Sequence, residues 1–167
     1  MQKLAALFVV TLFLTSCTQT YYIVRHAEKA VPSMGPTMST PDDPPLSEVG
    51  FKRAEALREA LKDKGINNIF STDTKRTRST AEPFRAFTGL AIQAYGPRID
   101  SIFISRLKST KGNTLVVGHS NTVDDIVNGL MGENKLTDLE DSEYDNIFII
   151  RYKRFLGTKV TYERIKY

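Results

Sequence analysis

Short apolar runs alternate along this chain with longer segments in which apolar residues recur at helical spacing. Four runs have the length and composition of buried strands: residues 21–24, 66–70, 90–95 and 114–118. Helices are predicted between and after them, over residues 47–64, 73–87, 98–109 and 121–131. Two final runs, 146–152 and 159–165, flank a Leu-Gly pair and predict a hairpin. This alternation predicts a three-layer α/β/α sandwich with a mostly parallel central sheet.

The segment between the first strand and the first helix has a different composition. Residues 30–45 contain five prolines and one glycine, which disfavours regular structure and predicts a long surface loop. Loops of this length within compact domains are usually functional or disordered. The acidic residue Asp43 in this loop is therefore a candidate for the site considered below.

The first residues also have a pattern of their own. A cationic start, Met1-Gln2-Lys3, precedes an apolar run of signal-peptide length that is too short to span a bilayer comfortably. The run ends in Leu-Thr-Ser-Cys at residues 14–17. This ending resembles the lipobox of bacterial lipoproteins. The resemblance implies a signal peptide over residues 1–16, a lipidated Cys17 with a short tether over residues 17–20, and a domain over residues 21–167.

A lipidated Cys17 would hold the protein to a membrane of the cell envelope, on the periplasmic or outer-membrane face. The pattern alone leaves two alternatives, which are an uncleaved anchor and a buried N-terminal helix. Cys17 is the only cysteine in the chain, so no intramolecular disulfide can form.

The charge of the chain adds little to this description. The formal net charge is +4, and the 25% of charged residues are well mixed in sign. A solvated surface with some additional lysine accounts for these values, and the basic residues do not cluster as in a nucleic-acid-binding stripe. We therefore expect no nucleic-acid partner.

Candidate chemistry appears at the ends of two strands. The chain has only two histidines: His26 follows the run Tyr-Tyr-Ile-Val-Arg, and His119 follows Thr-Leu-Val-Val-Gly. Ligands of open α/β sheets bind at the carboxyl ends of the strands. If the two strands are neighbours, both imidazoles lie at the same edge of the sheet.

Two arginines strengthen this candidate site. Arg25 precedes His26, and Arg76 lies near the start of the helix that follows the second strand. Guanidinium groups bind phosphoryl oxygens as planar forks. A helix that we expect to be capped by Asn121 would add backbone N–H groups, which also bind anions. Together these groups predict a phosphate pocket.

Four segments resemble motifs of the histidine phosphatase superfamily, also called the phosphoglycerate mutase-like family. Three of them are Val-Arg-His-Ala-Glu-Lys at residues 24–29, Leu-Ser-Glu-Val-Gly at 46–50 and Val-Val-Gly-His-Ser-Asn at 116–121. The fourth covers residues 71–81, which begin with Ser71, contain Arg76 and end in Thr80-Ala81. The segments occur in the order of the family's motifs and span most of the chain after residue 20. They resemble most closely the small phosphohistidine-phosphatase branch.

This resemblance implies a phosphoglycerate mutase-like fold and a metal-independent transfer through a phosphohistidine on His26. Arg25 and Arg76 would hold the phosphoryl oxygens, and His119 would stabilise the transition state. The imidazole must be neutral to attack phosphorus, and two nearby guanidinium groups would lower its pKa. We expect no cofactor and no metal.

The remaining contacts of the substrate and the general acid are less defined. Ser120 and Asn121 follow the second histidine and are expected to bind the substrate. Ser120 stands where one branch of the family has an aspartate that protonates the leaving group. Four carboxylates stay open as alternatives, none with motif support: Asp43, Asp100, Glu143 and Asp145. Without a general acid, good substrates would be those with easily released leaving groups.

The sequence therefore predicts a membrane-held phosphatase of phosphomonoesters or phosphoramidates, acting on a small phosphorylated substrate or a phosphoprotein. An alternative of another class is a non-catalytic phosphate- or anion-binding module with the same pocket. A mutase is disfavoured, because the chain lacks the additional segments with which such enzymes retain a bisphosphorylated intermediate.

Overall fold

The computed structural model describes residues 17–30, 43–154 and 157–167. The helices and strands are, in chain order, β1 (Cys17–Arg25), α1 (Glu48–Leu61), β2 (Ile66–Thr72), α2 (Lys75–Thr88), β3 (Ile92–Tyr95), α3 (Ser101–Ser109), β4 (Asn113–Gly118), α4 (Ser120–Met131), β5 (Asn146–Arg154) and β6 (Thr158–Lys166). Every strand and helix expected from the sequence is present in the expected order. The predicted signal peptide and most of the proline-rich loop lie outside the described residues.

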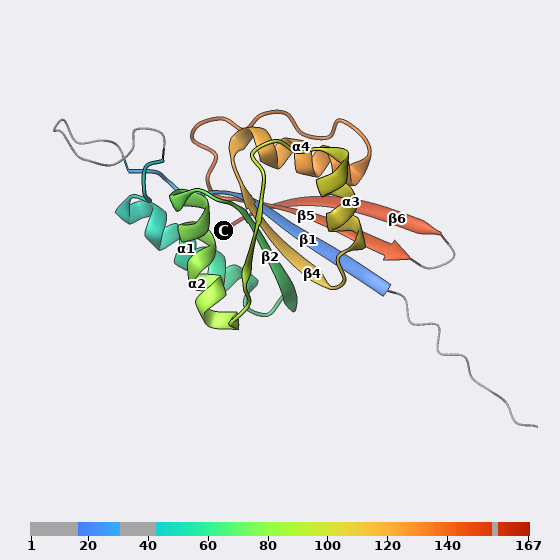
Figure 1. Ribbon diagram of the computed structural model, residues 1–167, viewed down its shortest axis with the longest axis horizontal. Coiled ribbons are helices and arrows are strands. Elements are labelled where there is room, and N and C mark those ends of the chain that lie inside the picture. Colours follow the sequence, from blue (N-terminus) through green and yellow to red (C-terminus); the bar gives the residue numbers. More distant parts are fainter. Residues whose placement is uncertain (1–16, 31–42, 155–156) are drawn as a thin grey trace, which may run out of the picture.

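One mixed sheet forms the middle layer of the fold. Its strand order is β3-β2-β4-β1-β5-β6. The strands β3, β2, β4 and β1 are parallel to one another, and β5 pairs antiparallel with both β1 and β6. Helices α1 and α2 cover one face, and α3 and α4 cover the other (Figure 1). The expectation of a three-layer sandwich with a mostly parallel sheet is confirmed.

The two cores follow from the alternation of side chains along the strands. On β1, Tyr21 and Ile23 face the core shared with α3 and α4, whereas Tyr22 and Val24 face the core shared with α1 and α2. Such strands are apolar on both faces, and this is why they read as continuous apolar runs in the sequence. None of the helices in the described ranges is long and apolar enough to cross a membrane.

The start of β1 corrects one expectation. Residues 17–20 were predicted to be a tether, but they are the first residues of β1 and pair with β5, where Cys17 lies opposite Arg154. Gln19 is buried, and its side-chain amide donates to the backbone carbonyls of Leu107 and Thr110. The polar sequence Thr-Gln-Thr has no apolar alternation, so the pattern gave no sign of a strand there.

The carboxyl ends of β1 and β4 lie side by side at the edge of the sheet that carries the predicted site. Arg25 is opposite Gly118 in the parallel register, and the backbone N–H of His26 donates to the carbonyl oxygen of Gly118 at 2.8 Å. The two strands that precede the histidines are therefore neighbours, as the placement of the histidines requires.

The first turn of α1 packs closely against the residues that follow His26. Ser47 caps the helix, and its backbone N–H donates to the carbonyl oxygen of Glu28 at 2.9 Å. A Cβ atom at Gly50 would lie 2.2 Å from that same carbonyl oxygen. Position 50 must therefore be glycine if the loop after His26 is to keep its path.

We predict that Gly50→Ala destabilises the protein by about 1–3 kcal/mol, the usual cost of overpacking. The gain in helix propensity, about 1 kcal/mol, offsets part of this cost. Urea denaturation measures the change in unfolding free energy. Gly96→Ala is the matched control, because a Cβ there meets nothing within 4 Å, and it should stay within about 0.5 kcal/mol of the wild type. Equal stability of the two variants would contradict the close packing of α1.

Candidate active site

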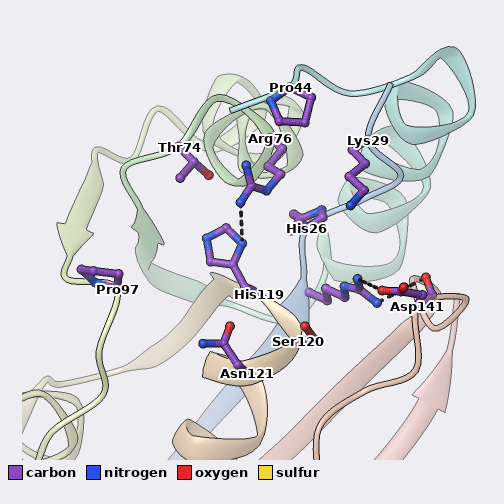
Figure 2. Close-up of a pocket in the computed structure, with 11 residues that line it drawn as sticks. His26, Lys29, Pro44, Thr74, Arg76, Pro97, His119, Ser120, Asn121 and Asp141 are labelled. Atoms are coloured by element: carbon purple, nitrogen blue, oxygen red, sulfur yellow. Dashed lines mark hydrogen bonds and ion pairs between the residues drawn. The ribbon is translucent and has the colours of Figure 1, made fainter. Parts of the chain in front are cut away.

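A cavity of about 520 Å³ opens at the carboxyl ends of β1 and β4. Figure 2 shows the side chains around it. The lining residues are Arg25, His26, Lys29, Pro44, Thr74, Arg76, Pro97, His119, Ser120, Asn121 and Asp141. All six residues that the sequence predicts for the phosphate pocket are among them: Arg25, His26, Arg76, His119, Ser120 and Asn121.

His26 follows the last residue of β1 and is 4% exposed. Its Nδ1 lies 2.7 Å from the carbonyl oxygen of Ala27. A carbonyl oxygen can only accept, so Nδ1 carries the proton and Nε2 keeps its lone pair. The path of the loop is fixed by the N–H of Ala27, which donates to Oγ1 of Thr80 at 2.9 Å. The ring is thereby held in the tautomer that a nitrogen nucleophile requires at Nε2.

His119 stands next to His26, with 5.3 Å between the ring centroids. It is the N-cap of α4, and its backbone N–H donates to Oγ1 of Thr122 at 2.8 Å. The expectation that Asn121 caps this helix is therefore wrong. Ser120 and Asn121 instead belong to the first turn of α4, where their side chains line the cavity. At the start of a helix, backbone N–H groups such as those of these two residues have no carbonyl partner one turn earlier in the helix.

Arg25 is 5% exposed and is held by the segment between α4 and β5. Its Nη1 donates to the carbonyl oxygen of Glu140 at 2.8 Å, and its Nη2 lies 3.4 Å from Oδ1 of Asp141. The guanidinium also stacks over the ring of Tyr144, with Cζ at 4.4 Å from the ring centroid. These contacts keep the charge of Arg25 at the wall of the cavity beside His26.

Arg76 lies in the first turn of α2 and reaches the opposite wall of the cavity. Its Nη1 is 3.3 Å from Oδ1 of Asp43, and its Nη2 is 3.3 Å from Nδ1 of His119. Asp43 in turn accepts from the backbone N–H of Lys75 at 3.0 Å, which fixes the start of the helix. Each pocket arginine thus contacts one carboxylate, Asp43 or Asp141, at the edge of the cavity.

The surroundings favour neutral imidazoles. Burial lowers the pKa of His26 to about 3, and the hydrogen bond to Ala27 opposes this shift. Repulsion from Arg25, from Arg76 and from His119 when it is protonated lowers the pKa further. Burial likewise lowers the pKa of His119 to about 4, helped by Arg76 and Arg25 and opposed by Asp43. Both rings are therefore uncharged at neutral pH.

The structure separates the four carboxylates that the sequence left open. Asp43 is not among the cavity-lining residues, but its carboxylate pairs with Arg76, which is. Asp100 caps α3 by accepting from the N–H of Phe103 at 2.8 Å. Glu143 and Asp145 form ion pairs with Arg164 and Lys166 and are not among the cavity-lining residues.

Several cavity residues were missed from the sequence: Pro44, Thr74, Pro97 and Asp141. Asp141 belongs to an acidic stretch without periodicity or motif, so its contact with Arg25 had no local signal. Among the residues that the structure describes, no three His, Cys, Asp or Glu side chains are grouped so that they could hold a metal ion.

A family model of the histidine phosphatase superfamily (branch 1) matches residues 21–100. This part of the chain is therefore similar in sequence to the histidine phosphatase superfamily. The probable phosphoglycerate mutase GpmB of Yersinia pestis (strain Pestoides F) is 27% identical over 111 residues, which are 66% of this chain and 51% of that protein. The chain therefore spans about half the length of the curated relatives it matches.

Solved structures of low sequence identity share the fold. The putative phosphohistidine phosphatase SixA from Agrobacterium tumefaciens matches with a TM-score of 0.64 and 20% identity, covering 87% of this chain and 97% of that one. The protein histidine phosphatase SixA complexed with tungstate matches with a TM-score of 0.66 and 17% identity, covering 88% and 96%. The expectation of a phosphoglycerate mutase-like fold is confirmed.

We predict that neither imidazole titrates between about pH 8 and about pH 5, because both pKa values lie below this range. The folded protein then binds fewer protons than the unfolded chain between about pH 4 and about pH 6.5, so the unfolding free energy falls as the pH is lowered through this range. NMR of the ring C–H groups, which come from two histidines only, follows the titration directly. A midpoint near pH 6.5 for either ring would contradict the description of the site.

Proposed function

We propose that the protein is a phosphatase that transfers a phosphoryl group from a small phosphorylated substrate to His26 and then to water. The observation that carries this proposal is the fixed tautomer of His26, whose Nδ1 donates to the carbonyl oxygen of Ala27 and whose Nε2 is left as a nucleophile. The ring lines a cavity whose other polar groups include two arginines, a second histidine and the first turn of a helix. The family match supports the reaction type.

Substrate binding would use the two arginines. A phosphoryl dianion between Arg25 and Arg76 replaces the carboxylates of Asp141 and Asp43 as their partner, with bidentate geometry and greater charge. The backbone N–H groups at the start of α4, together with Ser120 and Asn121, bind the remaining oxygens. Binding of this kind places phosphorus in line with Nε2 of His26.

In the first step the lone pair on Nε2 forms a bond to phosphorus, and the bond from phosphorus to the leaving oxygen or nitrogen breaks with its electron pair on the leaving atom. The arginines offset the charge that develops on the phosphoryl oxygens. In the second step water attacks phosphorus, its proton passes to solvent, and the P–N bond returns its electrons to Nε2. Inorganic phosphate is the product.

The substrate class follows from the carboxylates at the cavity. Asp43 and Asp141 both contact the arginines, and Asp43 also accepts from the backbone N–H of Lys75, so these carboxylates already serve other partners. We infer a preference for leaving groups that depart without help, such as aryl phosphates and phosphoramidates, since general acid catalysis typically contributes about 10²–10⁴-fold. A phosphate- or anion-binding module without turnover is the alternative, and the tautomer of His26 favours the enzyme.

We predict that the purified protein hydrolyses 4-nitrophenyl phosphate in the presence of EDTA. His26→Ala should lower kcat at least about 10³-fold because it removes the nucleophile. Arg76→Ala should lower kcat/KM about 10²–10³-fold because it removes a donor to the phosphoryl oxygens. Arg78→Ala is the matched control, since Arg78 is on the same helix, pairs with Asp73 at 2.9 Å and is half-exposed outside the cavity.

The control should retain turnover within about twofold. Rapid quenching with labelled substrate should trap an acid-labile phosphoryl group on the wild type and none on His26→Ala. Binding of phosphate without turnover by the wild type would support the anion-binding module instead. Wild-type turnover in His26→Ala would refute the nucleophile.

We also propose that Cys17 carries a lipid that holds the protein to the cell envelope. β1 begins at Cys17 and runs for nine residues, so the cavity lies roughly 25 Å away at the other end of the strand. Basic residues also follow or end the elements at the same end of the sheet as Cys17, where Asp63 and Glu133 are acidic. These basic residues are Lys62, Lys64, Lys108, Lys111, Lys153, Arg154 and Lys159. Each basic residue near an anionic membrane surface contributes about 1 kcal/mol. In this orientation the cavity opens away from the membrane.

We predict that the protein isolated from bacterial membranes begins at Cys17 and that its mass exceeds the polypeptide mass by that of attached lipid. Cys17→Ser should keep the unprocessed leader and lose the added mass. Ser16→Ala, which keeps a small residue before the cysteine, should be processed like the wild type. Mass spectrometry of the N-terminal peptide measures all three, and an unmodified Cys17 in the membrane fraction would refute the anchor.

A further inference from the structure

A chain of buried hydroxyl groups lies behind His119. Thr72, the last residue of β2, is 3% exposed, and its Oγ1 is 2.9 Å from Nε2 of His119. The same Oγ1 is 3.0 Å from Oγ1 of Thr77, which is fully buried in the first turn of α2. Thr77 Oγ1 donates to the carbonyl oxygen of Thr72 at 2.8 Å. None of these hydroxyl groups has a role in the phosphoryl transfer as described so far.

The direction of the hydrogen bonds around His119 follows from Arg76. A guanidinium can only donate, so Nδ1 of His119, at 3.3 Å from Nη2 of Arg76, must accept. The proton of the neutral ring is therefore on Nε2, and it is donated to Oγ1 of Thr72. Thr72 donates to Thr77, and Thr77 donates to a carbonyl oxygen, so every hydroxyl proton in the chain has an acceptor.

The two histidines are thereby held in opposite tautomers. His26 carries its proton on Nδ1, which faces the carbonyl oxygen of Ala27, and His119 carries its proton on Nε2, which faces Thr72. The lone pairs are left on Nε2 of His26 and Nδ1 of His119. The first of these lone pairs is the proposed nucleophile, and the second is oriented toward Arg76.

We propose that Thr72, supported by Thr77, is a positioning residue that holds His119 as the Nε2–H tautomer with Nδ1 directed at the phosphoryl site. The proposal rests on the phosphatase function given above. When a phosphoryl dianion engages Arg76, Nδ1 of His119 loses its donor and takes up a proton from solvent. The new Nδ1–H group keeps this proton and donates a hydrogen bond to a phosphoryl oxygen. His119 then stabilises the transition state as an imidazolium while Thr72 still accepts from Nε2–H.

The charges around His119 are consistent with this exchange. Arg76 and Arg25 oppose protonation of the ring, and Asp43 favours it. The neutral ring of His26 lies on one side, and the charged groups of Lys29 and Asp141 also line the cavity. A bound dianion adds two negative charges next to Nδ1 and offsets the arginines, so protonation follows binding rather than preceding it.

If Thr72 only stabilised the fold, removal of its hydroxyl group would not change the tautomer of His119. Thr72→Val removes the hydroxyl at constant shape, and Thr72→Ser keeps it. Thr88→Val is the control for a threonine-to-valine change outside the cavity. The Thr88 hydroxyl donates to the carbonyl oxygen of Phe84 at 2.9 Å and accepts from the backbone N–H of Leu90 at 3.4 Å. An Nε2–H group left buried without an acceptor costs roughly 1–3 kcal/mol, which is enough to turn the ring or move its proton.

The decisive measurement is 15N NMR of the imidazole nitrogens, which is unambiguous with two histidines in the chain. In the wild type we expect one ring protonated on Nδ1 and the other on Nε2. In Thr72→Val the signals of His119 should shift to a mixture of tautomers while those of His26 stay unchanged. Thr72→Ser and Thr88→Val should match the wild type. Inorganic phosphate added at neutral pH should move both nitrogens of His119 to imidazolium positions.

Two outcomes would overturn the proposal. One is a wild-type His119 protonated on Nδ1, a result that needs no variant to fold. The other is a folded Thr72→Val protein with the wild-type pattern. In kinetics, Thr72→Val should lower kcat/KM about 10- to 100-fold and change its pH profile, with Thr72→Ser restoring both. Because the NMR experiment does not depend on turnover, failure of the phosphatase proposal would be distinguished from failure of the positioning role.

Discussion

The parallel pairing of β1 with β4 is the contact on which the site depends. Its register sets Arg25 opposite Gly118, and the backbone bond from His26 to Gly118 extends the ladder by one residue beyond the end of the strand. Both histidines thus leave the sheet at the same edge, with their ring centroids 5.3 Å apart. A shift of the register by one residue would send the side chains of β1 to the opposite faces and separate the two rings.

The site combines buried imidazoles with guanidinium groups, and this combination explains its electrostatics. Burial and positive neighbours both disfavour a charged ring, so the histidines stay neutral. The guanidinium groups beside them contact Asp43, Asp141 and the backbone carbonyl of Glu140. The cavity is therefore positive yet contains unprotonated nitrogens, which is the requirement for attack on a phosphoryl anion. In the proposed reaction, a substrate anion would take over the donors that these two carboxylates now contact.

Much of the fold and the centre of the site could be predicted because their signals are local. Apolar runs and helical periodicity identified the strands and helices, since burial on both faces of a sheet leaves a continuous apolar sequence. Arg25, His26 and His119 lie at the ends of strands, and Arg76 lies in the first turn of a helix. Their common location could therefore be inferred from where these elements end and begin. The start of β1 at residues 17–20 could not, because polar residues there are buried through hydrogen bonds that involve distant backbone carbonyls.

The sequence by itself determined the order of the elements, the α/β class and the residues that meet at the carboxyl edge, because periodicity and strand ends are properties of neighbouring residues. Only the tertiary structure decided which carboxylates contact the arginines, that α4 begins at Ser120 with His119 as its cap, and that Thr72 lies behind His119. These partners are far apart in the chain, and hydrogen bonds depend on positions and directions in space that no local pattern encodes. The tautomers of the two histidines belong to this second group, since each is set by the acceptor that the fold places beside the ring.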